Sequence, residues 1–209
     1  MSKEVDTSKV NRPALGRRPV RAALVAAVVV VAVVVVVLVR GAGTETVPYA
    51  DPASSGLLTL CDAKGNQVTG GKVTDKPLAP FVLGSTPLDS QVPADSVGFG
   101  TLYGYQPREG VEPLEFSGAP IGGPEAFTDH ARPATRVVKD GYSLADFTSI
   151  YPATLDGYVQ LRLITSVDGF GAFADAYDTA DIKIDGDSWT VVRGGNASCA
   201  DASTLLAGR

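Results

Sequence analysis

The feature that most constrains this chain is an uncharged apolar run between Arg21 and Arg40. Residues 22–39 contain only Ala, Leu and Val. As a helix they extend about 27 Å, close to the roughly 30 Å hydrocarbon core of a bilayer. A lone segment in lipid must satisfy its own backbone hydrogen bonds, so the run predicts a transmembrane helix rather than the strand that Val favours in water.

The charges on either side of the run predict its orientation. Residues 1–21 carry six basic and two acidic residues, whereas residues 41–209 carry 11 basic and 21 acidic residues. Because basic flanks stay inside, we expect a single-pass plasma-membrane protein with a cytoplasmic N-terminus and an extracytoplasmic C-terminal domain. A cleaved signal peptide is one alternative, because the small residues 41–43 could form its cleavage site. The apolar region of a signal peptide is usually shorter than the run seen here. A buried core helix is the other, disfavoured by the adjacent basic residues.

Composition divides the chain into four parts. We expect a basic tail over 1–21, the transmembrane helix over 22–39, a flexible linker over 40–55 and one domain over 56–209. The linker is small, polar and Pro-containing. The domain is acidic, which argues against nucleic acid as a partner because phosphate binding requires clustered Lys and Arg.

The only two cysteines, Cys61 and Cys199, both fall in the predicted extracytoplasmic part. Thiols oxidise outside the membrane, so an even count predicts a disulfide between them. A catalytic Cys would need a His, and the only His is His130. A Cys-based metal site would need further ligands at short spacing, which the sequence does not offer.

Short strand patterns separated by Gly and Pro predict a mainly β domain, an extracytoplasmic β-sandwich of the immunoglobulin-like or a similar type. Residues 158–165 alternate most clearly, residues 97–105 place glycines on one face, and Asp185-Gly186 predicts a tight hairpin turn. Further strands are expected at 57–61, 81–83 and 136–139. One short helix is expected after Ser143, whose spacing to Asp146 fits a capping box, and a helical turn is expected at 125–127.

Two groups of polar residues are candidates for chemical sites. Asp181, Asp185 and Asp187 are either solvated acids of a hairpin or oxygen ligands of a Ca²⁺ loop, joined by Asp175 and Asp178, but hairpin periodicity favours the first. His130, beside Asp129, resembles half of a catalytic triad or is a surface His. The sequence therefore predicts no catalytic residue, no metal site and no cofactor.

The segment 102–116 interleaves aromatic and acidic residues in a loop context. Tyr-rich loops form good contact surfaces, so Tyr103, Tyr105, Arg108 and Phe116 are candidates for a binding surface. The alternative is that the three aromatic residues simply pack in the core.

Several segments together resemble uncharacterised membrane-anchored or secreted proteins of actinobacteria. The resemblance is carried by residues 56–62, 105–108, 151–152, 156–163 and 181–192 with the late Cys199. It covers nearly the whole extracytoplasmic domain and implies an extracytoplasmic β domain. It implies no activity and no site residues.

The sequence favours a membrane-anchored extracytoplasmic binding or scaffold module of the cell envelope over an enzyme. Its expected partners are the lipid bilayer, through the helix, and a cell-envelope protein or glycan. An accessory subunit of a membrane complex ranks second, because the Val-rich helix lacks a motif for specific packing. A cell-wall-acting enzyme ranks third.

Overall fold

The computed structural model describes residues 46–89 and 92–206. The predicted cytoplasmic tail, the predicted transmembrane helix over 22–39 and the first part of the predicted linker lie outside these residues. Within residues 46–89 and 92–206, no helix is both long and apolar enough to cross a membrane.

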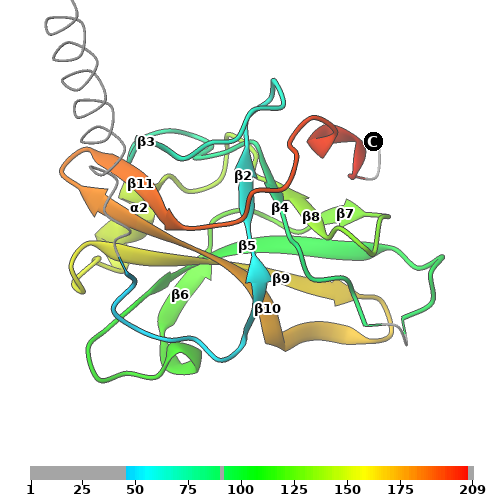
Figure 1. Cartoon of the computed structure of the whole chain (residues 1–209), viewed down its shortest axis with the longest axis horizontal. Helices are drawn as coiled ribbons and strands as arrows, with labels where there is room; N and C mark the ends of the chain where they lie inside the picture. The colour runs from blue at the N-terminus through cyan, green and yellow to red at the C-terminus, as the bar shows by residue number, and fades with distance from the viewer. Residues whose placement is uncertain (1–45, 90–91, 207–209) are drawn as a thin grey trace, which may run out of the picture. The chain divides into compact units, whose positions relative to one another are not determined.

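The larger of two sheets contains eight strands (Figure 1). Its main path is β3–β11–β10–β9–β5–β6, with β1 pairing β10 and β7 pairing β5. All these pairs are antiparallel except β1 with β10. The strands are β1 Ser54–Leu57, β3 Gly70–Lys72, β5 Gly98–Gln106, β6 Ser117–Pro120, β7 Glu125–Phe127, β9 Tyr158–Val167, β10 Gly171–Asp185 and β11 Ser188–Arg193.

The smaller sheet has three antiparallel strands in the order β2–β4–β8. They are β2 Thr59–Cys61, β4 Phe81–Leu83 and β8 Ala134–Arg136. The described residues also include the helix α2 Leu144–Ile150 and two 3₁₀ turns, η1 Pro113–Glu115 and η2 Ala202–Thr204. The domain is therefore mainly β and sandwich-like, as predicted.

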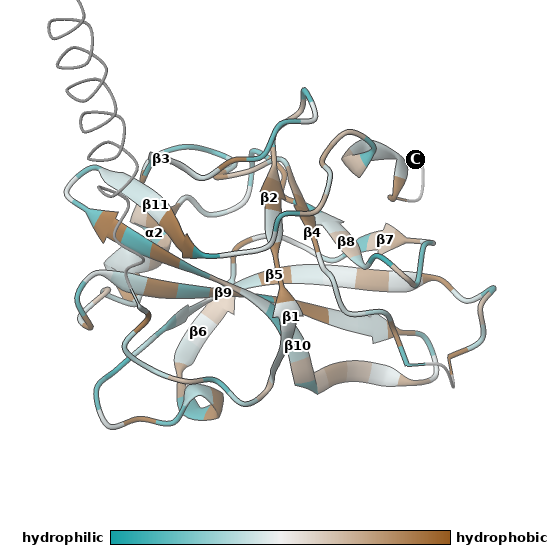
Figure 2. Cartoon of the chain, in the orientation of Figure 1, coloured by the Kyte–Doolittle hydropathy of each residue, from teal (hydrophilic) through white to brown (hydrophobic). Residues whose placement is uncertain are grey.

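The core lies between the two sheets and follows from strand alternation. On β9, Val159, Leu161 and Leu163 are buried on the face toward the smaller sheet. Leu60 of β2 and Val82 of β4 belong to the same apolar cluster. Figure 2 shows brown apolar segments along both sheets, with teal polar residues concentrated in the connecting loops. The opposite face of the larger sheet carries Gln160 and Arg162, which are also buried.

The predicted helix and its cap are confirmed. Ser143 Oγ accepts a hydrogen bond from the Asp146 backbone N–H, and the Asp146 carboxylate accepts one from the Ser143 N–H. This capping box satisfies two backbone donors that a helix start leaves open. Leu144 and Phe147 then pack into the core.

The glycines of β5 allow the close backbone approach that the sequence predicts. A Cβ atom built on Gly100 would lie 2.6 Å from the Ala134 carbonyl oxygen of β8. Real Cβ atoms do not approach a backbone oxygen so closely, so a larger residue here would push the two sheets apart. The predicted hairpin is also confirmed: Asp185 pairs with Ser188, and Gly186 takes a φ of +55°.

Three sequence predictions differ from the structure. Residues 125–127 form strand β7 rather than a helical turn, because they pair with Gly98–Gly100 of β5. The strand expected at 136–139 is centred earlier, at Ala134–Arg136, where the backbone pairs with β4. The predicted linker over 40–55 ends before residue 49, because Tyr49 and Asp51 contact the larger sheet and Ser54 begins β1.

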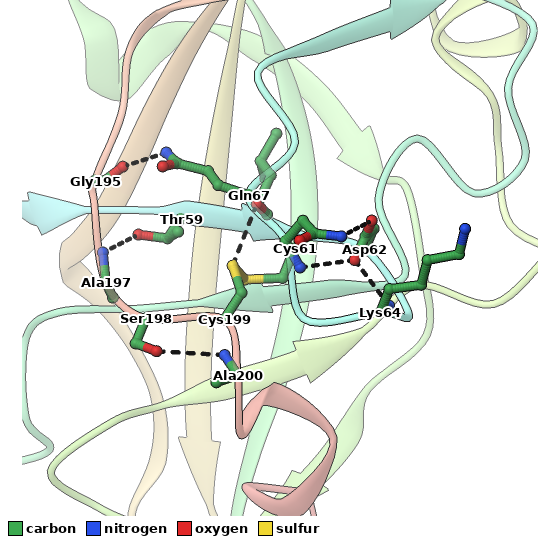
Figure 3. Close-up of a disulfide and its surroundings, with 12 residues drawn as sticks. Thr59, Cys61, Asp62, Lys64, Gln67, Gly195, Ala197, Ser198, Cys199 and Ala200 are labelled. Carbon is green, nitrogen blue, oxygen red and sulfur yellow. Dashed lines mark hydrogen bonds between the residues drawn. A yellow bond between two sulfur atoms is a disulfide. The ribbon is translucent and has the colours of Figure 1, made fainter.

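The predicted disulfide between Cys61 and Cys199 is confirmed (Figure 3). It joins β2 to the C-terminal segment across a sequence separation of 138 residues. Hydrogen bonds extend the attachment: Thr59 Oγ1 accepts from the Ala197 N–H at 3.0 Å, and Gln67 Nε2 donates to the Gly195 carbonyl at 2.8 Å. The bridge thereby fixes the last segment to the first strand of the smaller sheet.

Candidate functional site

Three of the four predicted surface residues lie close to one another. Tyr103 and Tyr105 stand on the outer face of β5, with their rings stacked at 6.1 Å between centroids, and both are half-buried. Phe116 follows η1 and is buried. Arg108 lies exposed in the intervening loop. Tyr105 and Phe116 both contact Arg162 of β9.

Arg162 is the centre of a buried polar layer on the outer face of the larger sheet. Its guanidinium lies 4.0 Å from the Tyr105 ring centroid and 4.4 Å from that of Tyr177. Its Nε donates to Gln160 Oε1 at 2.6 Å, and its Nη2 donates to the Pro113 carbonyl at 2.7 Å. Such a desolvated cation between aromatic rings contributes about 2 kcal/mol per good ring contact. The domain therefore holds this cation in one orientation.

The segment preceding β1 covers this layer, and we refer to residues 46–53 as the strap. Figure 1 shows the strap, in blue, passing η1 on its way into β1. Asp51 Oδ2 lies 3.8 Å from Arg162 Nη2 and accepts a hydrogen bond from the Tyr177 hydroxyl at 3.2 Å. Burial raises the pKa of the Tyr177 hydroxyl, with the Arg162 cation opposing this shift and Asp51 adding to it. Tyr177 therefore stays a neutral donor toward Asp51.

A second contact attaches the strap to β10. The Tyr49 hydroxyl donates to the Asp181 carboxylate, which also accepts from Arg193 Nε at 2.5 Å. Burial raises the pKa of Asp181, although these two donors oppose that shift. Burial and the adjacent Asp181 also raise the pKa of the Tyr49 hydroxyl. Asp181 is thus a buried, bonded group and not the solvated turn acid that the hairpin pattern suggests, whereas Asp185 and Asp187 are exposed.

A cleft of about 250 Å³ opens beside this layer, on the core side of the larger sheet, and we refer to it as the sheet cleft. It lies where the pairing of β9 with β10 is interrupted between Phe173 and Asp178. Strand residues of the larger sheet and loop residues next to β4 and β8 line it: Ser55, Thr86, Pro87, Leu88, Asp89, Pro133, Leu163, Thr165, Phe173, Ala176, Tyr177 and Asp178. Tyr177 therefore contributes both to the sheet cleft and to the polar layer.

Asp178 organises one wall of the sheet cleft. Its Oδ2 accepts hydrogen bonds from the backbone N–H groups of Ser85 at 2.5 Å and Thr86 at 3.0 Å, and its Oδ1 accepts from Thr86 Oγ1 at 2.5 Å. A Cβ on Gly84 would lie 2.5 Å from the same carboxylate, so glycine is required for this approach. Because both oxygens are engaged, Asp178 shapes the loop after β4 rather than serving as a free acid or base.

The remaining lining combines hydroxyl groups with aromatic and proline surfaces. Ser55, Thr86 and Thr165 in this lining carry hydroxyls, of which that of Thr86 donates to Asp178, and Phe173 and Tyr177 carry aromatic rings. Hydroxyls and carboxylates bind partners with polar hydrogens, while ring faces take apolar C–H surface. The cleft can therefore bind a small neutral ligand with alternating hydroxyl and C–H surface.

The other chemical candidates lie apart from these two places. His130 Nε2 is 2.8 Å from the Ser96 carbonyl oxygen, and its ring packs edge-on against Phe127. Its neighbour Asp129 instead forms an ion pair with Arg132. Among residues 46–89 and 92–206, no three His, Cys, Asp or Glu side chains are grouped as a metal site.

The sequence contains only weak signals for the site residues that the sequence-based predictions missed. Gln160 and Arg162 interrupt an otherwise apolar strand, which in an antiparallel sheet is typical of a solvated face. Asp178 and Asp181 are three residues apart, an odd spacing, so strand geometry turns them to opposite faces of β10.

No known family model, curated protein or solved structure matches this chain.

Proposed function

We propose that this chain is a membrane-anchored extracytoplasmic binding module of the cell envelope, with its ligand site in the sheet cleft. The uncharged run over residues 22–39 is the proposed anchor, which leaves residues 46–206 on the outer side. The disulfide suits an oxidising compartment. We further propose that the two sheets are a β-sandwich of the immunoglobulin-like or a similar type.

The lining of the sheet cleft supports a neutral, hydroxyl-rich ligand, which in the envelope means a carbohydrate. The observation that carries this proposal is that Phe173 and Tyr177 line one cleft together with Thr86 and Thr165. Asp178 adds negative charge to the wall, which disfavours anionic ligands. The volume of about 250 Å³ lies below the roughly 300–1,000 Å³ of drug-sized pockets, so it suits a single sugar residue of a longer glycan.

A titration of the full chain in lipid nanodiscs tests the ligand proposal. The probes are neutral N-acetylglucosamine oligomers and soluble fragments released from cell walls. Phe173→Ala removes ring surface from the cleft, and binding is expected to weaken about tenfold, the equivalent of about 1.4 kcal/mol. Phe170→Ala is the matched control, because Phe170 is exposed in the β9–β10 turn and does not line the cleft. Absence of saturable binding, or equal losses in both variants, would contradict the proposal.

Labelling of intact cells tests the placement. A membrane-impermeant amine reagent should modify Lys64 and Lys72, which are exposed in the domain, but not Lys3 or Lys9 of the tail. Mass spectrometry of the labelled chain identifies the sites. Labelling of the tail alone would reverse the proposed topology, and a mature N-terminus just after residue 43 would indicate a cleaved signal peptide.

A further inference from the structure

The strap contacts the sheet mainly through side chains, with one backbone hydrogen bond from the Tyr177 N–H to the Ala53 carbonyl at 3.1 Å. Residues 46–53 lie outside every strand, and Pro48 and Pro52 lack the N–H groups that a sheet ladder needs. Tyr49 and Asp51 are two residues apart, so in an extended segment their side chains lie on the same side. Both point to the sheet, Tyr49 to Asp181 and Asp51 to Arg162 and Tyr177.

The surface beneath the strap is fixed independently of it. Arg162 makes its two short hydrogen bonds with Gln160 and Pro113, and its guanidinium lies between the rings of Tyr105 and Tyr177. None of these groups belongs to the strap. By contrast, the distance from Arg162 Nη2 to Asp51 is 3.8 Å, beyond hydrogen-bond range. The cation is therefore preorganised for a carboxylate that it holds only loosely.

Two buried donors in the same layer make no hydrogen bond of normal geometry among the described residues: Gln160 Nε2, which interacts with the Asp181 carboxylate, and Arg193 Nη2. Gln160 is fully buried. Buried donors are paired in the great majority of cases, so unpaired ones mark a place where a further acceptor fits. The layer thus has an excess of donors over the acceptors that the strap provides.

We propose that the groove formed by Tyr105, Gln160, Arg162, Tyr177 and Asp181 is a binding site for an extended peptide of a partner protein. The peptide would present a hydroxyl-bearing aromatic side chain and, two residues later, a carboxylate. The strap is then a built-in occupant, whose Tyr49 and Asp51 fill the groove when the partner is absent. A partner carboxylate that engages Arg162 directly displaces the strap.

A trans-peptide experiment tests this proposal separately from the carbohydrate proposal, because the groove lies on the opposite face of the larger sheet and shares only Tyr177 with the sheet cleft. The probe is a fluorescent peptide with the sequence of residues 46–54, added to the full chain in nanodiscs. In the wild-type chain the tethered strap competes at an effective concentration in the millimolar range, so binding is expected to be weak. In the chain carrying Tyr49→Phe and Asp51→Asn, the peptide is expected to bind at least tenfold more tightly.

Matched peptides and variants decide the outcome. We refer to the chain carrying Tyr49→Phe and Asp51→Asn as the opened chain. A peptide with Asn in place of Asp51 should bind the opened chain at least tenfold more weakly than the original peptide does. Tyr177→Phe, which keeps the ring over Arg162 but removes the hydroxyl that donates to Asp51, should weaken binding of the original peptide. Equal binding of the two peptides, or no binding to the opened chain, would overturn the proposal. Trp189 fluorescence checks that each variant is folded, because this single Trp is buried in the core.

If the opened chain does not fold, the wild-type chain still gives an answer. Saturating peptide should then increase hydrogen exchange of the backbone amides at Tyr49–Ala53 while leaving those of β9 unchanged. No change at the strap under a thousandfold excess of peptide would refute displacement.

Discussion

Breaking the Cys61–Cys199 bridge is expected to remove most of the stability margin of the domain. The bridge closes a loop across a sequence separation of 138 residues. The chain-entropy relation for a loop of this length gives about 5 kcal/mol at 25 °C. Because natural domains are stable by roughly 5–15 kcal/mol, the reduced chain should be marginal. The loss should exceed that of a short-range bridge, since this loop contains nearly every strand.

Urea denaturation followed by Trp189 fluorescence measures this loss. The full chain is held in micelles of a mild detergent, with and without reductant, and Trp189 reports on the core because it is buried on β11. The midpoint should fall on reduction. The slope with urea should rise at the same time, because an uncrosslinked unfolded chain exposes more surface.

A comparison with the double variant Cys61→Ala, Cys199→Ala separates the loss of the crosslink from the loss of packing. Reduction removes only the bond, whereas the variant also removes two buried sulfur atoms. Both samples should lose several kcal/mol, and the variant should lose somewhat more. A loss below about 1 kcal/mol on reduction would refute the entropic argument, and free alkylation of both cysteines in the unreduced protein would refute the bridge itself.

Two further predictions follow from local geometry. Gly100→Ala should cost about 2 kcal/mol, because the new Cβ would meet the Ala134 carbonyl oxygen at 2.6 Å, whereas Gly123→Ala meets no atom within 4 Å and should leave the urea midpoint unchanged; equal midpoints for the two variants would contradict the packing argument. The ion pair with Lys76, and then the capping bonds with Ser143, lower the pKa of Asp146 to about 2. Asp146 therefore stabilises the folded state above its ordinary pKa of 3.8, and this contribution is lost as the pH falls toward 2. A carboxyl NMR titration should show the low pKa, and Lys76→Gln should raise it; an unchanged value would contradict the assigned cause.

Local patterns in the sequence predicted much of the fold. The alternation along 158–165, the capping box at Ser143 and the Asp185-Gly186 turn each depend on a few neighbouring residues. The disulfide was predictable because the sequence contains only two cysteines, which allow a single pairing. By contrast, β7 was missed because three residues in a Gly- and Pro-rich stretch acquire strand geometry only by pairing with β5.

The polar layer could not be predicted because it depends on contacts between distant segments. Arg162 and Gln160 alternate with apolar residues as they would on a solvated face, but the strap, the η1 loop and the rings of neighbouring strands bury them. The strap itself has linker composition. Its side-chain contacts with Asp181 and Tyr177 span more than 100 residues. The sheet cleft likewise arises where two distant sheets meet, beside an interruption in strand pairing.

The most direct test of the proposed binding function is a methyl NMR titration of the full chain in nanodiscs with N-acetylglucosamine oligomers. The threonine methyl groups report on the site, because Thr86 and Thr165 line the sheet cleft. Thr190, exposed on β11, serves as the internal reference. Saturable shifts at Thr86 and Thr165, with Thr190 unchanged, are the predicted result. Unchanged spectra throughout, or shifts confined to residues outside the cleft, would contradict a carbohydrate site in the sheet cleft.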